Sequence, residues 1–255
     1  MEQLTGRIAL ITGAGSGLGQ AAATALAAEG AITVVTELPD RLARAEATVA
    51  TIKGAGGEAH AVALDVLDLA SIAACVEAAA RISGRIDILV NNAGVNVRRK
   101  AYEVSEADWD AVVDVNLKGV FFVAQAVGLR MRDQNPAGGC IINVASQMGL
   151  VGYYDRAAYC SSKAGVVNLS RALAIEWAPD HIRVNTVCPT FVDTPLTRPM
   201  FEHNPEMGQD ILNRILNHRL ATADEIAAGI VYLASPGAAM VNGHALTIDG
   251  GWTAI

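Results

Sequence analysis

A tyrosine and a lysine four positions apart, Tyr159 and Lys163, are the residues in this sequence best suited to moving a proton. They fall in the segment 156–177, whose pattern predicts a helix, so their side chains lie one turn apart on one face. A phenol is a weak base near neutral pH because its ordinary pKa is about 10, but a neighbouring positive charge favours the phenolate. The pair therefore predicts acid–base chemistry at the Tyr159 hydroxyl.

A serine supplies a second group for the same reaction. Ser146 stands just after the apolar run 141–144, which predicts a strand, and it precedes the helix that carries the tyrosine. Ligands of doubly wound sheets bind at the carboxyl ends of the strands. We therefore expect the Ser146 hydroxyl to hold the reacting oxygen of a substrate beside Tyr159.

The elements that must position these residues alternate between short β-branched runs and alanine-rich helical stretches. Near-continuous apolar strands indicate a sheet covered on both faces, and alternation with helices indicates parallel strands. The sequence predicts one α/β domain over residues 1–255, a Rossmann-type doubly wound parallel sheet of about seven strands flanked by helices. The expected strands are 7–11, 31–36, 59–64, 86–90, 140–144, 183–187 and 245–248.

One segment interrupts this alternation. Residues 189–220 carry Pro195, Pro199 and Pro205 among scattered apolar residues. Prolines disfavour both helix interiors and central strands. We expect this segment to form a mobile lid over the substrate.

The first strand leads into a glycine-rich turn, Thr12-Gly13-Ala14-Gly15-Ser16-Gly17-Leu18-Gly19, and a helix is expected over 20–29. Glycines at a strand-to-helix turn let the backbone approach a pyrophosphate, whose charge then lies among the unpaired N–H groups of the helix N-terminus. Four glycines within seven residues at this place favour a dinucleotide site over a merely steric turn.

Glu37 ends the second expected strand, where an acidic side chain can accept hydrogen bonds from both hydroxyls of an adenosine ribose. This position favours NAD over NADP, because a carboxylate repels a 2′-phosphate and neither Ser16 nor Leu38 supplies a compensating cation. Arg41 is the nearest cation that opposes this interpretation. The alternative for Glu37 is a solvated charge at the end of a strand.

Composition narrows the class of protein further. The net charge of −7 over 255 residues repels phosphate backbones, so no nucleic-acid partner is expected. The longer uncharged stretches, such as 226–248, contain Gly, Pro, Asn or Ser, and residues 1–10 show no signal segment, so we expect no membrane partner and a cytoplasmic protein. Cys75, Cys140, Cys160 and Cys188 lie far apart, which predicts neither a disulfide framework nor a metal site.

Taken in order, the motifs resemble those of the short-chain dehydrogenase/reductase family. The resemblance covers nearly the whole chain and also includes Asn91-Asn92-Ala93-Gly94, Asn116 and the closing Asp249-Gly250-Gly251. It implies hydride transfer between NAD and a CH–OH group or ketone. It also implies that Tyr159 is the general acid/base, Ser146 orients and polarises the substrate oxygen, Lys163 binds the nicotinamide ribose and lowers the pKa of Tyr159, and Asn116 anchors a water in the proton relay.

The same resemblance implies a set of cofactor contacts, among them Asp65 beside the adenine and Thr194 beside the nicotinamide carboxamide. Asp65 has an alternative role as the cap of a helix beginning near Leu67, and the paired asparagines have one in stabilising a turn. Thr190 departs from the glycine that many family members carry after Pro189, so its Cβ is expected to narrow the nicotinamide pocket or redirect the lid. The expected cofactor-binding residues are Gly13, Ser16, Gly17, Leu18, Gly19, Glu37, Asp65, Val66, Asn92, Ala93, Gly94, Tyr159, Lys163, Pro189, Val192 and Thr194.

Several residues expected around the substrate can form hydrogen bonds, which favours a sugar, polyol or sugar acid over a steroid or long acyl chain. The basic run 98–100 could face a carboxylate, but a solvated loop is the preferred interpretation. His203 is more typical of a surface histidine than of a second acid/base group. The substrate candidates are Asn96, Gln147, Tyr153, Tyr154 and His203, with Phe191 and Met200 as further members of the lid.

Two other functions remain open. An NADPH-dependent ketoreductase acting on a 3-oxoacyl group or small ketone would use the same catalytic residues, and Glu37 argues against it. A non-catalytic dinucleotide sensor would keep only the fold, and the presence of Ser146, Tyr159 and Lys163 argues against it. By family resemblance, helices over 106–132 and 156–177 form subunit interfaces of a homotetramer.

Overall fold

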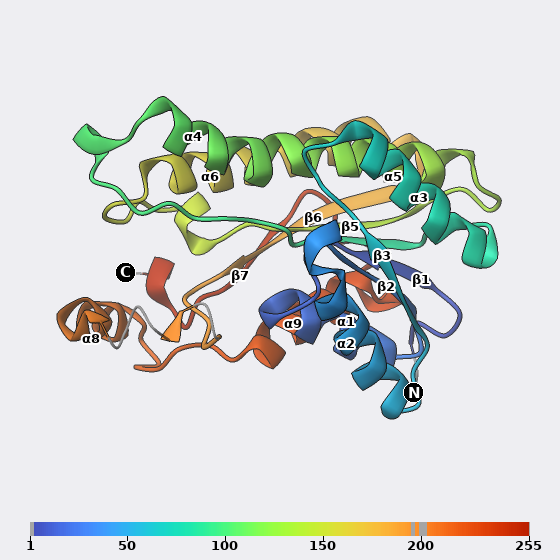
Figure 1. The fold of residues 1–255 in the computed structure, drawn as a ribbon, viewed down its shortest axis with the longest axis horizontal. Coiled ribbons are helices and arrows are strands. Elements are labelled where there is room, and N and C mark those ends of the chain that lie inside the picture. Colours follow the sequence, from blue (N-terminus) through green and yellow to red (C-terminus); the bar gives the residue numbers. More distant parts are fainter. Residues whose placement is uncertain (1–2, 195–196, 199–202, 255) are drawn as a thin grey trace.

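The computed structural model describes residues 3–194, 197–198 and 203–254, and it arranges them in three layers (Figure 1). The central layer is a parallel sheet in the order β3-β2-β1-β4-β5-β6-β7. This order confirms the predicted doubly wound sheet, and each expected strand is present. The strands are β1 (Ile8–Ile11), β2 (Ile32–Glu37), β3 (Ala59–Ala63), β4 (Ile88–Asn91), β5 (Gly139–Val144), β6 (Ile182–Pro189) and β7 (Ala245–Ile248).

Helices cover both faces of the sheet (Figure 1). One face is covered by α1 (Gly17–Ala28), α2 (Leu42–Gly54) and α9 (Ala223–Ala234), and the other by α3 (Leu69–Ser83), α5 (Val120–Asp133) and α6 (Ala157–Trp177), with α4 (Glu106–Val113) packed on α6. Successive strand residues face opposite layers: Leu10 packs with α3 and α5, whereas Ile11 packs with α1 and α9. Both side chains are fully buried, which contributes about 1.5–3 kcal/mol each to folding.

Residues 106–133 form one continuous helical run, because a π-helical turn at Asp114–Gly119 joins α4 to α5. By length and composition alone this run could cross a membrane, although the sequence analysis expected no such segment. In the fold, Val123, Val127 and Met131 are buried in the same cluster as the strand residues Leu89 and Ile141. The apolar composition of this run is therefore accounted for by packing on the sheet.

The predicted lid, 189–220, contains more regular structure than its prolines suggested. Pro189 is the last residue of β6, and α8 (Pro205–Arg214) occupies the second half of the segment. Pro205 is the first residue of α8, where its missing N–H costs nothing, and the Asn204 side chain accepts a hydrogen bond from Met207 N. Pro195 and Pro199 lie outside the described residues.

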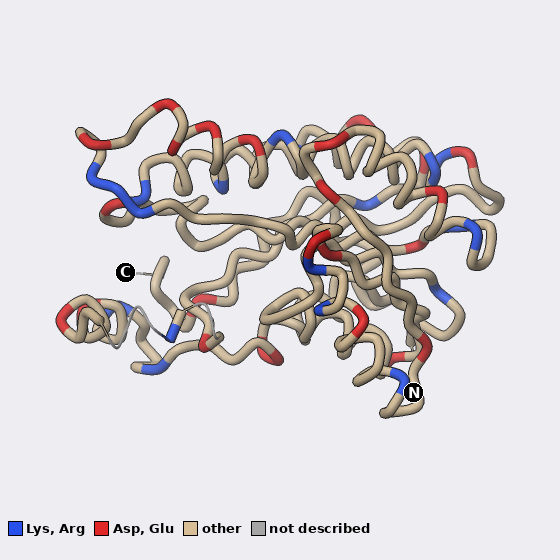
Figure 2. The backbone as a smooth tube through the Cα atoms, viewed as in Figure 1, with Lys and Arg blue, Asp and Glu red and all other residues tan. Residues whose placement is uncertain are grey.

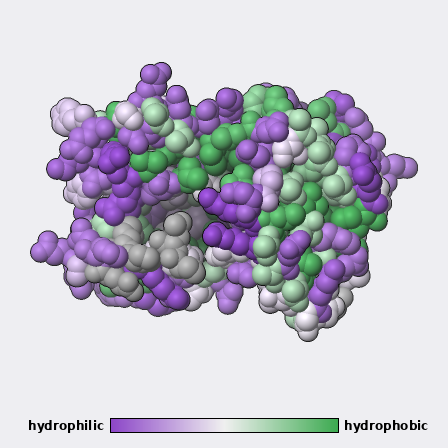
Figure 3. Space-filling model, in the orientation of Figure 1, coloured by the Kyte–Doolittle hydropathy of each residue, from purple (hydrophilic) through white to green (hydrophobic). Residues whose placement is uncertain are grey.

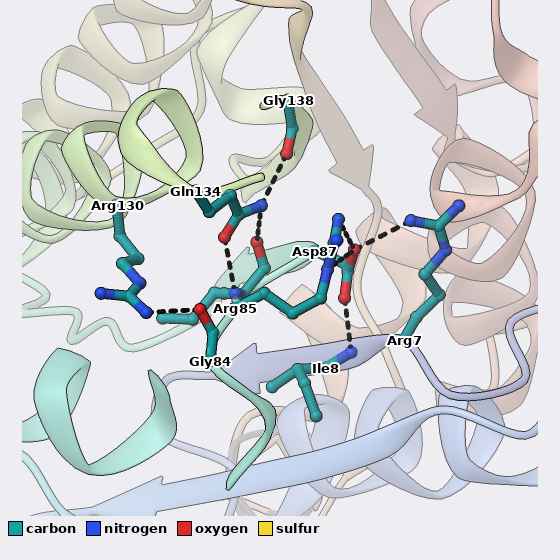
Figure 4. Close-up of polar contacts among 9 residues, drawn as sticks. Arg7, Ile8, Gly84, Arg85, Asp87, Arg130, Gln134 and Gly138 are labelled. Carbon is teal, nitrogen blue, oxygen red and sulfur yellow. Dashed lines mark hydrogen bonds and ion pairs between the residues drawn. The ribbon is translucent and has the colours of Figure 1, made fainter. Parts of the chain in front are cut away.

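The amino ends of the strands are fixed by a polar cluster (Figure 4). Asp87, directly before β4, is 4% exposed, accepts a hydrogen bond from Ile8 N and pairs with Arg7 at 2.9 Å and Arg85 at 2.8 Å. Gln134 at the end of α5 bonds to both backbone groups of Ile86. Elsewhere, residues of both charge signs lie mainly in helices and loops (Figure 2). Because this cluster lies at the edge opposite the carboxyl ends of the strands, its role is structural.

Candidate active site

The glycine-rich turn between β1 and α1 has no room for larger residues at its end. A Cβ on Gly19 would lie 2.5 Å from both Gly13 O and Asn92 Nδ2, and Gly13 and Gly17 adopt φ of +61° and +56°. Asn92 Nδ2 donates to the backbone oxygens of Thr12 and Gly13 at 3.0 Å, which ties the end of β4 to the turn. The asparagine therefore does stabilise a turn, as the alternative interpretation held.

This turn fits a dinucleotide pyrophosphate. Ser16, the residue before α1, is exposed and makes no side-chain capping bond, so the first N–H groups of α1 are not covered by a capping side chain. A Cβ on Gly17 would find only Thr194 Cγ2, at 3.9 Å, while Leu18 packs partly into the core below. The backbone can thus come close to an anion, as expected for this site.

Glu37 ends β2 beside the same turn. Its Oε1 accepts a hydrogen bond from Leu38 N at 3.0 Å, and a Cβ on Gly15 would lie 2.8 Å from its Oε2. The carboxylate therefore faces the glycine-rich turn and is not a freely solvated charge. Arg41 is about half exposed, and its nearest acidic partner is Asp40, at 3.9 Å.

The loop after β3 differs from the expected cap. Asp65 Oδ1 accepts a hydrogen bond from Leu67 N, but α3 begins at Leu69 and its capping residue is Asp68, which accepts from Ala70 N. Asp65 therefore does not cap this helix, although its turn shapes the entry to it. Val66, the next predicted cofactor contact, packs close to Gly119 of the π-helical turn.

The three main catalytic candidates lie together at the carboxyl end of β5. Ser146 follows this strand, accepts a hydrogen bond from Met148 N at 3.1 Å and hydrogen-bonds the Tyr159 hydroxyl. Lys163, one turn along α6, is 4% exposed and donates from Nζ to Val144 O at 2.8 Å. Its Nζ lies 5.7 Å from the Tyr159 ring centre.

Asn116 reaches this centre from the π-helical turn. It is fully buried, and its side-chain amide bonds to both the N–H and the carbonyl oxygen of Val95 at 2.8 Å. Its Nδ2 also lies 3.3 Å from Ser162 Oγ on α6. Asn116 therefore holds the loop that contains Ala93 and Gly94 against α6; π-helical turns are often found at such functional positions. The water expected at Asn116 stays a prediction.

Burial has the largest effect on the pKa values of the candidate catalytic groups. It raises the pKa of Tyr159, while the hydrogen bond from Ser146 and the positive charge of Arg156 lower it and Cys160 opposes them. Burial also lowers the pKa of Lys163 to about 8. The ammonium form of Lys163 is thus held in an unfavourable apolar setting beside the phenol.

The segment after β6 leaves the sheet at the same edge as the end of β5. Val192 pairs with Ala221 in an isolated bridge, and the Thr194 hydroxyl lies 3.2 Å from that of Thr197. Thr190 donates its backbone N–H to Ile248 O, whereas its buried Oγ1 has no hydrogen-bond partner among the described residues. This segment is where Pro189, Val192 and Thr194 were predicted to meet the nicotinamide.

The substrate candidates divide into two groups. Gln147, beside Ser146, is 1% exposed, and neither polar atom of its amide has a partner in the described part of the chain. Tyr153 is partly buried and donates its hydroxyl to Asp210 of α8 at 2.9 Å. Asn96, Tyr154 and His203 are exposed, and Met200 lies outside the described residues.

A cluster of three aromatic rings beside Tyr159 was not predicted from the sequence. The rings of Tyr153, Phe191 and Trp252 have centres 5.4–5.9 Å apart. Arg214, paired with Asp210 one turn earlier on α8, lies over Tyr153 and Trp252. The i,i+4 spacing of that ion pair was a visible signal, but the meeting of the C-terminal Trp252 with the lid was not.

Comparison with known proteins agrees with this site. Residues 13–253 match a family profile described as enoyl-(acyl carrier protein) reductase. The chain is 45% identical to D-threitol dehydrogenase of Mycolicibacterium smegmatis, over 98% of this chain and 94% of that protein. It is 39% identical to 3-oxoacyl-acyl-carrier-protein reductase of Thermotoga maritima, over 98% of each chain. A gluconate 5-dehydrogenase from Burkholderia cenocepacia, solved with NADP and tartrate, superposes with a TM-score of 0.93 at 33% identity, over 100% of this chain and 98% of that one.

Proposed function

Because the chain belongs to the short-chain dehydrogenase/reductase family, we propose that it is an NAD-dependent dehydrogenase that interconverts a secondary alcohol and a ketone of a sugar, polyol or sugar acid. The observation that carries this proposal is the contact of the Ser146 and Tyr159 hydroxyls, with Lys163 one turn along α6 and the glycine-rich turn nearby. A sensor that only bound a dinucleotide would have no use for these groups in this arrangement.

The mechanism follows from what each side chain can do. When bound, the nicotinamide supplies the hydride acceptor for oxidation and the hydride donor for reduction. In oxidation, the Tyr159 phenolate takes the hydroxyl proton of the substrate as the hydride leaves the same carbon; in reduction, the phenol returns the proton. Ser146 donates a hydrogen bond that holds the reacting oxygen in line. Lys163 would hold the nicotinamide ribose and supply positive charge, while Asn116 fixes the neighbouring loop.

The preference for NAD is supported by Glu37. Its carboxylate faces the glycine-rich turn, where it would accept hydrogen bonds from two ribose hydroxyls and repel a 2′-phosphate. We expect wild-type kcat/KM to favour NAD, and Glu37→Ala to reduce that preference by at least about tenfold, since two charge-assisted hydrogen bonds are lost. Glu46→Ala, which removes an exposed carboxylate on α2, is the matched control and should leave the preference unchanged. A wild-type preference for NADP would contradict this assignment.

The preference for a polyhydroxylated substrate is supported by the polar groups near Ser146. Gln147, which follows Ser146, has a buried amide with no partner among the described residues, and burying such a group without a partner costs about 1–3 kcal/mol. The part of the surface around the lid is mostly hydrophilic (Figure 3). Relatives named for threitol and gluconate fit the same class.

A substrate panel tests the proposal. Purified protein is mixed with NAD or NADP and with polyols, sugars and sugar acids, and in the other direction with ketones and a 3-oxoacyl thioester, while reduced nicotinamide is followed by absorbance. We expect turnover with NAD and a polyhydroxylated alcohol. Faster turnover of a 3-oxoacyl thioester with NADPH would favour the ketoreductase, a function supported by the Thermotoga relative. No turnover with either cofactor across the panel would favour the sensor.

We also propose a cytoplasmic homotetramer with no membrane or nucleic-acid partner. Trp109, Leu129 and Ile175 leave large apolar side chains exposed on α4, α5 and α6. Between α5 and α6 lies a cavity of about 190 Å³ lined by Phe121 and Trp177. Exposed apolar groups of this kind support an interface on these helices. Light scattering of the purified protein should give four times the protomer mass, 26.5 kDa.

A further inference from the structure

A buried arginine lies immediately before the catalytic helix. Arg156 is the residue that precedes α6, three positions before Tyr159, and it is 3% exposed. Its guanidinium centre lies 5.3 Å from the ring centre of Tyr153 and 5.5 Å from that of Phe191, and its Nη1 donates to Tyr154 O at 3.2 Å. Two cation–π contacts and a backbone bond therefore hold this cation in place beside the reaction centre.

Arg156 lies near Tyr159, because Tyr159 packs in the same cluster as Tyr153 and Phe191, the two rings that Arg156 contacts. Burial and the neighbouring Arg98 lower the pKa of Arg156, but a guanidinium remains charged throughout the working range of a protein. In turn the positive charge of Arg156 lowers the pKa of Tyr159. Lys163 is a second cation near Tyr159, but its Nζ donates to Val144 O at 2.8 Å and lies 5.7 Å from the Tyr159 ring centre.

Within residues 3–194, 197–198 and 203–254, other charged or titratable groups around Arg156 come from four elements. Tyr159 and Cys160 lie on α6 itself, and Tyr153 and Asp155 lie in the turn before it. Arg98, from the loop after β4, lies 3.9 Å from Asp155, which offsets part of its charge. Asp210 and Arg214 face the same aromatic group from α8.

The lid helix fixes the ring on which the arginine lies. Tyr153 donates its hydroxyl to Asp210 at 2.9 Å, and Arg214 Nε bonds to the two oxygens of Asp210 at 3.1 and 3.0 Å. Arg214 also lies 5.8 Å from the centre of the Tyr153 ring, on the same ring that Arg156 contacts. The position of α8 is therefore linked, through one aromatic ring, to the position of Arg156.

We propose that Arg156 is a positioning residue that stabilises the phenolate of Tyr159, and that the lid helix α8 holds it there through Tyr153. This inference rests on the proposed function, in which Tyr159 is the acid/base group.

The test is the pH dependence of both reaction directions in Arg156→Met. Loss of the cation raises the pKa of Tyr159, so the acid limb of kcat/KM for alcohol oxidation should move up by about one pH unit, an approximately tenfold loss below the limb. In ketone reduction the alkaline limb should move up equally, so the variant keeps activity at higher pH than wild type. Damage to the fold alone would lower kcat/KM in both reaction directions without moving either limb of the pH profiles.

A second readout does not depend on turnover. The ultraviolet absorbance of tyrosinate is followed as a function of pH in wild type and in Tyr159→Phe, and the difference between the two curves gives the titration midpoint of Tyr159. The same difference is then measured between Arg156→Met and the double variant Arg156→Met, Tyr159→Phe. We expect the Tyr159 midpoint to rise in that background. If no substrate is turned over but the midpoint rises, the proposed function fails and this inference stands. If turnover is normal but neither the midpoint nor the limbs move, the inference fails alone.

Further variants separate the arginine's possible roles. Arg156→Lys should move the limbs less than Arg156→Met, because it keeps the charge. Tyr153→Leu should move them in the same direction as Arg156→Met, whereas Tyr153→Phe keeps the ring and should move them less. Lys53→Met removes an exposed cation remote from the site and should change nothing. An increase in KM confined to sugar acids, with unmoved limbs, would show that Arg156 binds a substrate carboxylate instead and would overturn the proposal.

Discussion

Replacing Lys163 by methionine should abolish activity and yet stabilise the cofactor-free protein near neutral pH. Lys163 is 4% exposed, and burial lowers its pKa from 10.5 to about 8. A shift of about 2.5 units, at about 1.4 kcal/mol per unit, is a cost of about 3 kcal/mol for keeping this group charged in the folded state. Methionine removes that cost and loses one hydrogen bond to Val144 O, worth about 1 kcal/mol.

The difference in stability between the methionine variant and wild type depends on pH. Between about pH 8 and 10.5 the unfolded lysine still holds its proton while the folded one has lost it, so this group's contribution to stability rises with pH. At pH 7 the methionine variant should be more stable than wild type by about 2 kcal/mol. By pH 10 that advantage should have disappeared.

Urea unfolding followed by circular dichroism, at fixed protomer concentration and without cofactor, measures both proteins across this range. Burial raises the pKa of Cys75 to about 12 and those of Cys140 and Cys188 to about 11, and these thiols are common to both proteins. Their contribution largely cancels in the difference between wild type and variant. A difference that stays constant from pH 7 to 10 would refute the reasoning about Lys163.

Two further predictions concern the phosphate turn and the opposite edge of the sheet. Gly19→Ala should weaken NAD binding and lower the free energy of unfolding by about 1–3 kcal/mol, because its Cβ would lie 2.5 Å from Gly13 O. In the control Gly54→Ala the new Cβ meets no atom within 4 Å, so stability should be nearly unchanged. Cofactor titration and thermal denaturation check both variants. Asp87→Asn should cost about 2 kcal/mol because it breaks the pairs with Arg7 and Arg85. Asp133→Asn breaks an exposed pair with Arg132 and should leave stability nearly unchanged. Equal losses in denaturant unfolding would contradict the role given to Asp87.

Local sequence patterns were sufficient to predict the sheet and the proximity of Ser146, Tyr159 and Lys163. Tyr159 and Lys163 are brought together by the period of a single helix, and Ser146 is placed by the end of a single strand. The glycine-rich turn needs its glycines because of contacts within one strand–turn–helix unit and the end of β4. Features set by neighbours along the chain, or by the regular order of a parallel sheet, are the ones that sequence reasoning recovers.

Features set by distant contacts were not predicted. The placement of Arg156 depends on Tyr153 and Phe191, and the latter comes from beyond β6. The π-helical turn that buries Asn116 has no periodic signature, and the start of α3 is set by Asp68, where Asp65 was the expected cap. In the lid, Pro205 begins a helix that is held by Asp210 and Tyr153, a contact between segments far apart in the sequence.

The most direct test of the whole account is single-turnover oxidation by Tyr159→Phe with bound NAD. The variant should still bind the cofactor, since the glycine-rich turn and Glu37 are intact. Its hydride-transfer rate, measured with saturating NAD, should fall by about 10²–10⁴ because the proton acceptor is missing. A hydride-transfer rate close to that of wild type would contradict the assignment of Tyr159 as the group that moves the proton.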